Sequence, residues 1–165
     1  MRRFGGLIAS LLVCTLTGCL YSFAGGGLPP HIHTMAIVTF DNQTPSPDIP
    51  KELYDRMRKE LLRSLGVRDA TQERADAIVK GVIQSYDADV PVGFSANPLN
   101  AVTARRHLQL TIEVEITDQS NGKVIYANKA LRGEADYAER AEVEGRTLAI
   151  AKIVQSIVEG VQSKW

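Results

Sequence analysis

Few side chains in this sequence could carry out covalent or metal chemistry. The chain has two cysteines and three histidines among its 165 residues. His31 and His33 are spaced like the start of a metal site, but such a site takes three or four ligands, and no others follow at a suitable spacing. His107 has no serine, cysteine or paired carboxylate that the sequence singles out as its partner. The sequence therefore predicts neither a metal centre nor an enzyme.

Cys19 is the residue with the clearest chemistry of its own. It follows Arg2, Arg3 and an apolar run over residues 4–16. This run is shorter than the roughly 20 residues that a membrane-spanning helix needs, so it is typical of a signal peptide. Leu16-Thr17-Gly18-Cys19 resembles the bacterial lipobox, which implies cleavage before Cys19 and lipid on its thiol and new amino group. The alternative is an ordinary secretory signal in which the cysteine is incidental.

Removal of residues 1–18 as a lipoprotein signal peptide would leave a chain of the usual size for one domain. Cys14 would leave with the signal and Cys19 would carry lipid, so no thiol would remain for a disulfide or a catalytic site. The whole chain has no net charge and lacks a polybasic stretch, which argues against nucleic acid as a partner. We expect a lipidated linker rich in glycine and proline over residues 19–33, and a single domain over residues 34–165.

The first half of that domain has the pattern of a strand, a helix and a second strand. Branched and aromatic residues predict a strand over residues 34–40. A helix is predicted over residues 50–65, where apolar side chains recur every four residues at Leu53, Met57, Leu61 and Leu65. Residues 77–86 read as a central strand, in which Gly81 allows a bulge or a close approach. A right-handed crossover would make the two strands parallel.

The second half begins with a predicted long loop over residues 87–105. Apolar and polar residues then alternate over residues 108–117, which predicts a strand with one buried face. Turn residues 118–122 lead to a fourth strand over residues 124–131 that completes an antiparallel hairpin. A final helix is predicted over residues 141–164, with an apolar stripe formed by Val143, Ile150, Val154, Ile157, Val158 and Val161.

The predicted elements follow the order βαβββα. The simplest layered solution is an α+β two-layer sandwich, in which two helices pack on one face of a mixed four-stranded sheet.

Several short motifs together resemble the lipopolysaccharide-assembly lipoprotein family, LptE. They are Cys19-Leu20-Tyr21-Ser22-Phe23, Leu28-Pro29-Pro30-His31-Ile32, Phe40-Asp41-Asn42 and Ala75-Asp76-Ala77, and they are followed by a terminal helix that runs to Trp165. The resemblance implies a non-enzymatic lipoprotein that plugs the lumen of an LptD-type β-barrel and assists its assembly. It also implies binding of lipopolysaccharide, a periplasm-facing location at the outer membrane, and no cofactor beyond the lipid on Cys19. Leu20 directly after the cysteine is similar to the outer-membrane sorting pattern.

Four arginines are candidate lipopolysaccharide contacts under this resemblance, because a guanidinium can bind phosphate through two parallel hydrogen bonds. Arg105 and Arg106 end the predicted long loop, and Arg132 and Arg140 lie around the connection between the fourth strand and the last helix. We expect all four toward edges of the sheet. Each of them could equally be an ordinary solvated charge.

A second resemblance supports a different class of function. Ala36-Ile37-Val38 and Phe40-Asp41-Asn42 are similar to the first strand of LpoB and of the CsgG amino-terminal region. Such a periplasmic lipoprotein would regulate a cell-wall synthase or form a secretion pore. A third alternative, a hydrolase, would require the fold to bring a nucleophile and a base together.

Overall fold

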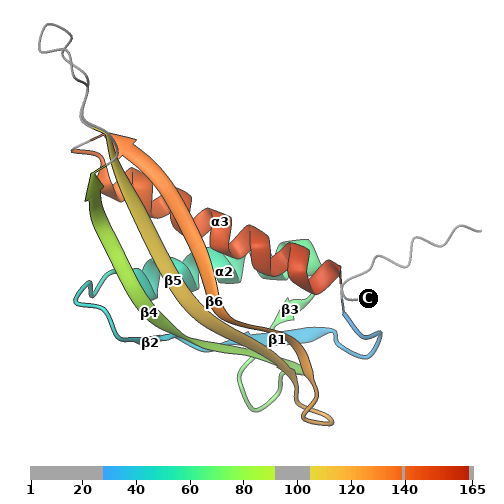
Figure 1. Cartoon of the computed structure of the whole chain (residues 1–165). Coiled ribbons are helices and arrows are strands. Elements are labelled where there is room, and N and C mark those ends of the chain that lie inside the picture. The colour runs from blue at the N-terminus through green and yellow to red at the C-terminus, as the bar shows by residue number, and fades with distance from the viewer. Residues whose placement is uncertain (1–27, 92–104, 139, 164–165) are drawn as a thin grey trace, which may run out of the picture.

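The structure, a computed structural model, describes residues 28–91, 105–138 and 140–163. Two helices lie on one face of a single sheet (Figure 1), and the predicted α+β two-layer fold is confirmed. Cys19 and the predicted signal peptide lie outside the described residues. The elements are β1 (Thr34–Ile37), β2 (Asp41–Asn42), α2 (Ile49–Leu65), β3 (Arg68–Asp69), β4 (Ala77–Pro91), β5 (Arg105–Asp118), β6 (Val124–Ala138) and α3 (Glu142–Gln162).

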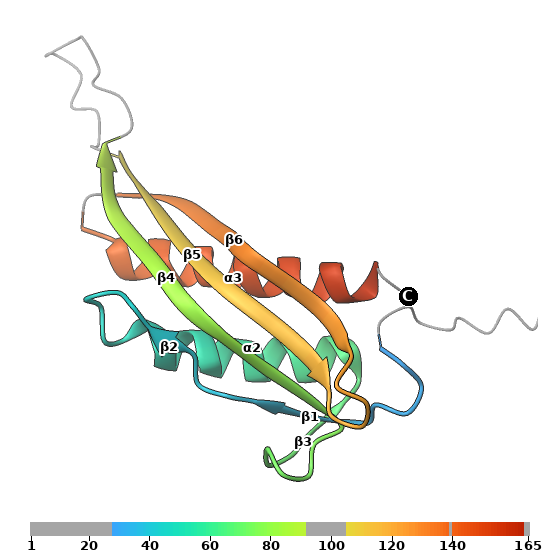
Figure 2. The ribbon, with the colours of Figure 1, turned by 60° about the horizontal axis from the view of Figure 1, so that its bottom comes forward.

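The sheet has the strand order β3-β1-β4-β5-β6, and β2 also pairs with β4. β1 and β4 are parallel, as the crossover predicted, and β4, β5 and β6 form an antiparallel meander (Figure 2). The two-residue strands β2 and β3 enlarge the predicted four-stranded sheet to six strands. β2 exists because β1 covers only the beginning of β4, which leaves Val82 and Ile83 to pair with Asp41 and Asn42.

The break between β1 and β2 lies over Gly81. A Cβ atom at Gly81 would come within 2.1 Å of the Glu113 carbonyl oxygen and 2.4 Å of the Phe40 ring. The ring of Phe40, only 4% exposed, therefore occupies the space that a side chain at Gly81 would need. The close approach expected at this glycine is confirmed.

The strands of the meander are longer than predicted. β4 continues to Pro91, β5 already begins at Arg105, and β6 continues to Ala138 instead of ending at Leu131. The predicted loop over residues 87–105 is thus strand at both of its ends, and residues 92–104 lie outside the described part. In the added half of β6 the buried positions are Gly133, Ala135 and Tyr137, and the first two are too small to give a strong apolar alternation.

The helices form the second layer. The predicted stripe of α2 is buried at Leu53, Met57 and Leu61, and Gly66 ends the helix in the left-handed conformation at φ 67°. The predicted stripe of α3 is also buried, apart from the partly buried Val158 and from Val143, which lies in the first turn and is 62% exposed.

Three glycines allow α3 to lie directly against β6. A Cβ atom at Gly133 of β6 would come within 2.3 Å of the Ala149 carbonyl oxygen in α3. On the helix, Gly145 lies against the ring of Tyr137 and Gly160 against the ring of Tyr126. Backbone and rings therefore pack without intervening side chains along the length of the helix.

The two helices run parallel. Arg146 near the start of α3 contacts Glu52 near the start of α2, and Gln162 at the end of α3 donates to the Ser64 carbonyl oxygen near the end of α2. Both helices consequently start toward one end of the sheet and stop toward the other. We call the first the arginine end, formed by residues 89–91, 105–107, 137–138 and 140, and the second the turn end, formed by residues 28–33 and 118–123.

The free edge of β6 is not a regular strand edge. Lys129 and Ala130 together face the single residue Glu113, which is a β-bulge. The Lys152 ammonium of α3 donates a 2.7 Å hydrogen bond to the backbone carbonyl of Glu134. The bulge and the lysine interrupt the regular row of backbone groups along this edge.

Candidate functional site

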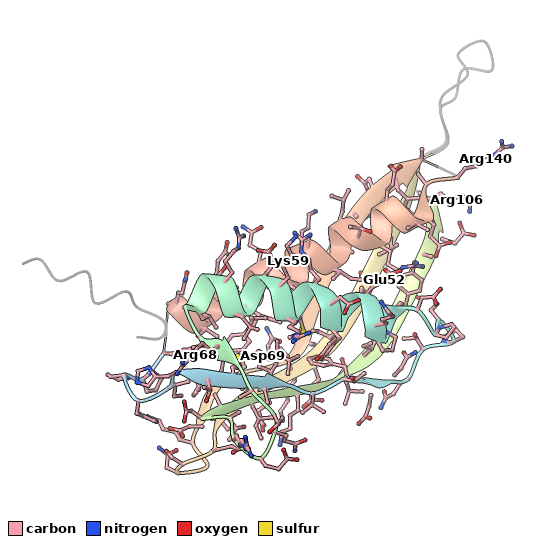
Figure 3. The ribbon with its side chains drawn as sticks, turned by 180° about the vertical axis from the view of Figure 1, so that it is seen from behind. Glu52, Lys59, Arg68, Asp69, Arg106 and Arg140 are labelled. Atoms are coloured by element: carbon pink, nitrogen blue, oxygen red, sulfur yellow. The ribbon has the colours of Figure 1, made fainter. Side chains whose placement is uncertain are left out.

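The arginine end brings together the close of β4, the start of β5 and the close of β6. Arg106 is opposite Pro91 on one side and Tyr137 on the other, and Arg105 is opposite Ala138. Arg140 follows in the turn before α3, and Figure 3 shows it at the same end of the molecule as Arg106. Three of the four predicted arginines thus share one end, although the side chain of Arg105 lies outside the described part.

Charges of both signs occur at this end. The Arg106 guanidinium, 31% exposed, forms an ion pair with Asp89. His107 Nδ1 lies 2.8 Å from Asp136 Oδ1 and its Nε2 lies 3.9 Å from Glu134, so this histidine stands between two carboxylates on the sheet. Arg140 is exposed, and within residues 28–91, 105–138 and 140–163 it makes no hydrogen bond or ion pair. Of the two arginines whose side chains are described at this end, Arg140 is therefore the more accessible to an incoming anion.

Arg132 does not lie at the connection between β6 and α3, where the sequence placed it. It is opposite Thr111 in the middle of β6, because this strand runs on to Ala138. Its side chain is exposed and lines a groove of about 450 Å³ between β6 and α3, together with Lys152 and Glu159. The expectation that Arg132 lies at the connection between the fourth strand and the last helix is therefore wrong, although β6 is an edge strand of the sheet.

A polar network holds the helices beneath the arginine end. Arg146 donates to both carboxylate oxygens of Glu52, through Nε at 2.8 Å and Nη2 at 2.7 Å, and its side chain is only 11% exposed. The Tyr86 hydroxyl of β4 donates to Glu142 at 2.7 Å, and Glu142 also lies 3.8 Å from Arg146. β4, α2 and α3 are thereby joined at the turn that carries Arg140.

The network also shifts proton affinities. Burial, followed by the hydrogen bond to Glu142, raises the pKa of Tyr86. The hydrogen bond to Glu52 raises the pKa of Arg146 above the ordinary arginine value, although its burial acts in the opposite direction. Tyr86 therefore stays a neutral donor and Arg146 stays charged at any physiological pH. No local pattern in the sequence predicts this network.

The turn end is built around the carboxylate of Asp118. It is 2% exposed and accepts hydrogen bonds from Ser120, from Asn121 and from His31 Nε2, the last at 2.7 Å. Hydrogen bonding by Ser120 and, to a smaller extent, by His31 lowers the pKa of Asp118 to about 2, against the opposing effect of burial. The carboxylate is thus ionised at neutral pH and joins the β5–β6 turn to the segment before β1.

A second carboxylate fixes the start of β1. Asp76 Oδ2 accepts from the backbone N–H groups of His33 and Thr34 at 2.9 Å and from the Thr34 hydroxyl at 2.8 Å. The N–H of His33 and the bonds from Thr34 lower the pKa of Asp76. His31 and His33 are therefore used separately, one through its ring and one through its backbone.

No group of three histidine, cysteine or acidic side chains is placed to hold a metal ion within the described ranges. In the same part of the chain, neither helix has the length and apolar character required to cross a membrane.

The fold is similar to those of solved bacterial proteins. PelC of Paraburkholderia phytofirmans, solved as a dodecamer, is 21% identical with a TM-score of 0.51, and the match covers 79% of this chain and 92% of PelC. A minor lipoprotein of Acinetobacter baumannii is 15% identical with a TM-score of 0.50, over 81% of this chain and 94% of its own. Both similarities concern the fold alone.

No curated protein matches the sequence. Residues 32–162, however, match the LptE family, which is described as lipopolysaccharide-assembly. This match includes every strand and helix of the described structure. The chain therefore belongs to the LptE family of lipopolysaccharide-assembly proteins.

Proposed function

We propose that this protein is an outer-membrane lipoprotein, anchored by lipid on Cys19, that plugs an LptD-type β-barrel and assists its assembly in lipopolysaccharide transport. It binds lipopolysaccharide through the arginine end. Membership of the LptE family supports the general role, and the arrangement of the domain supports the specific one.

The elongated shape of the domain suits a plug that is tethered at one end. The 14 residues of β5 connect the two ends of the domain, and at about 3.3 Å per residue they span about 45 Å. The described chain begins at the turn end, with residues 28–33, and Arg140 lies at the opposite end of the domain (Figure 3). A domain held in this way carries its arginines deep into a barrel.

The open face of the sheet suits a water-filled lumen. Both helices cover the opposite face, so the side chains on the open face remain available to the interior of a barrel (Figure 2). Along β5 this face carries the partly exposed Gln109, Glu113, Glu115 and Thr117 and the buried Thr111. Barrel interiors are polar and some are filled by a plug, and the polar side chains of β5 are compatible with such an interior.

The exposed Arg140 beside Arg106 is the observation that carries the binding proposal. Changing Arg105, Arg106 and Arg140 together to glutamine is expected to weaken lipopolysaccharide binding at least about tenfold, because hydrogen bonds between charged groups contribute about 1.5–3 kcal/mol each. Binding is measured with purified protein and lipopolysaccharide, and circular dichroism checks the fold. Arg132→Gln is the control, since this arginine is exposed like Arg140 but lies away from the arginine end. Unchanged affinity of the triple variant would refute the proposed site.

Purification from detergent-solubilised outer membrane tests the partner and the anchor in one experiment. The wild-type protein is expected to carry acyl chains on Cys19 and to bring down a barrel of the LptD type, both identified by mass spectrometry. The Cys19→Ala variant is expected to be absent from the outer-membrane fraction but still folded, since a domain without acyl chains lacks a lasting membrane anchor.

Cys14→Ala is the control for that experiment, because Cys14 lies within the segment expected to be removed. Recovery of a penicillin-binding protein in place of a barrel would favour the synthase-regulating alternative. An unchanged outer-membrane location of Cys19→Ala would contradict the anchor.

A further inference from the structure

The segment before β1 has a firmly held end at residues 32–34. Ile32 is 4% exposed and belongs to the apolar core. Directly after it, Asp76 binds the backbone N–H groups of His33 and Thr34. Burial and two hydrogen bonds fix the chain at this point, so motion of the preceding residues would pivot about Ile32.

Residues 28–31, which we call the strap, are held differently. The long-range polar contact of the strap is the hydrogen bond of 2.7 Å between His31 Nε2 and Asp118. The His31 side chain is 50% exposed, so water can compete for its position. Asp118 keeps its hydrogen bonds from Ser120 and Asn121 if His31 leaves, and the β5–β6 turn therefore does not depend on the strap.

The strap is poorly packed on its other side. A groove of about 440 Å³ lies between strap residues Leu28, Pro29 and Pro30 and the ends of the helices at Arg63, Ser64 and Gln162. Only Leu28 adds apolar contact with the core, and it is partly buried. In Figure 1 the strap is the blue segment that curves between the end of α3 and the β5–β6 turn. Among the described residues, the strap runs along this groove and is held by the side-chain contact between His31 and Asp118.

We propose that residues 28–31 form a releasable strap, fastened to the β5–β6 turn by His31 and Asp118, whose opening lengthens the tether of the domain. The effect on the tether rests on the proposed acylation of Cys19. With the strap closed, nine residue steps join Cys19 to Leu28 and reach at most about 30 Å. Opening as far as Ile32 adds four steps, or up to about 14 Å. Pro29 and Pro30 restrict the backbone, so the released segment stays extended.

Hydrogen exchange of the full-length chain tests the strap itself. The Ile32 N–H donates to the Pro29 carbonyl oxygen at 3.0 Å and reports strap closure, whereas the Thr34 N–H reports the fixed end. His31→Ala is expected to accelerate exchange at Ile32 about tenfold and leave Thr34 unchanged, since a hydrogen bond to a charged group shifts an opening equilibrium by that order. Ser120→Ala, which removes a different donor from the same carboxylate, is expected to leave Ile32 unchanged.

Two outcomes would overturn the proposal. Unchanged exchange at Ile32 in His31→Ala would show that the side chain does not fasten the strap. Equal acceleration at Ile32 and Thr34 would show that the strap and β1 open together. Both the acylated protein and the full-length Cys19→Ala variant are measured, so the strap result does not depend on acylation.

Tether length is measured separately, in vesicles that contain the acylated protein. A nitroxide on Arg74→Cys, an exposed position near the turn end, reports its distance from spin-labelled lipid head groups. His31→Ala should extend the longest distances by up to about 14 Å. If exchange at Ile32 rises but these distances do not, the strap opens without lengthening the tether, which refutes that part of the proposal. Absence of acyl chains would instead refute the proposed function.

Discussion

Replacing Gly133 with alanine is expected to lower the free energy of unfolding by about 3 kcal/mol, measured by urea denaturation. The added Cβ atom would come within 2.3 Å of the Ala149 carbonyl oxygen and 2.7 Å of Ile153 Cγ1. A backbone carbonyl in a helix cannot move aside alone, so the whole of α3 must shift from β6. The gain from a less flexible unfolded chain, about 0.4–1 kcal/mol, is too small to offset this cost.

Gly122→Ala provides the matched control. Gly122 has a φ of 71°, and a methyl group added there would have no atom within 4 Å, so alanine meets backbone strain but no steric clash. Gly133 does not have a positive φ, so its loss would come from packing alone. A smaller destabilisation at Gly133 than at Gly122 would contradict the direct contact of strand and helix.

Replacing Arg146 with methionine is expected to cost about 2 kcal/mol of unfolding free energy. Methionine retains much of the packing but leaves Glu52 without its two hydrogen bonds. Breaking a fully buried pair costs about 3–5 kcal/mol, and the 34% exposure of the Glu52 side chain lowers this figure, because water can partly solvate the orphaned carboxylate. Urea denaturation of purified protein measures the effect.

The pair of Arg63 and Glu60 gives the comparison for this variant, because Glu60, though only 20% exposed, also has Arg56 at 3.9 Å and keeps that cation when Arg63 is replaced. The Arg63 side chain is 73% exposed, so Arg63→Met is expected to cost less than about 0.5 kcal/mol. Adding Glu52→Gln to Arg146→Met should recover part of the lost stability, because it removes the unpaired charge. Equal losses from Arg146→Met and Arg63→Met would show that the buried network does not hold the helices.

The elements that the sequence predicted best are those with strong periodic patterns. Alternation in β5 and the four-residue repeat in α2 identify the strand and the helix, because one face of each is buried and the other is wet. The end of β6 was missed because Gly133 and Ala135 fill the buried positions against α3, where larger side chains would not fit. With the strand predicted to end at residue 131, Arg132 was expected beyond it, whereas it lies within β6.

The polar contacts of the site depend on residues far apart in the chain. Asp118 and His31 are 87 positions apart, and Arg146 and Glu52 are 94. Neither pairing follows from local spacing, because each depends on how the helices and the turn are placed in three dimensions. Arg106 and Arg140 lie at one end of the molecule (Figure 3), because one lies at the start of β5 and the other follows the end of β6, and these two strand ends are paired.

The interrupted edge of β6 has a consequence for how the protein behaves near other β-structure. A regular 15-residue edge strand offers its free backbone groups to any unpaired strand nearby. In β6 this regular row is interrupted by the bulge at Lys129 and Ala130 and by the hydrogen bond from Lys152 to the Glu134 carbonyl. At the opposite edge of the sheet, β3 has only two residues. Under the proposed function the protein lies beside the unpaired strands of an unfinished β-barrel, and the interrupted edge would keep β6 from pairing with them.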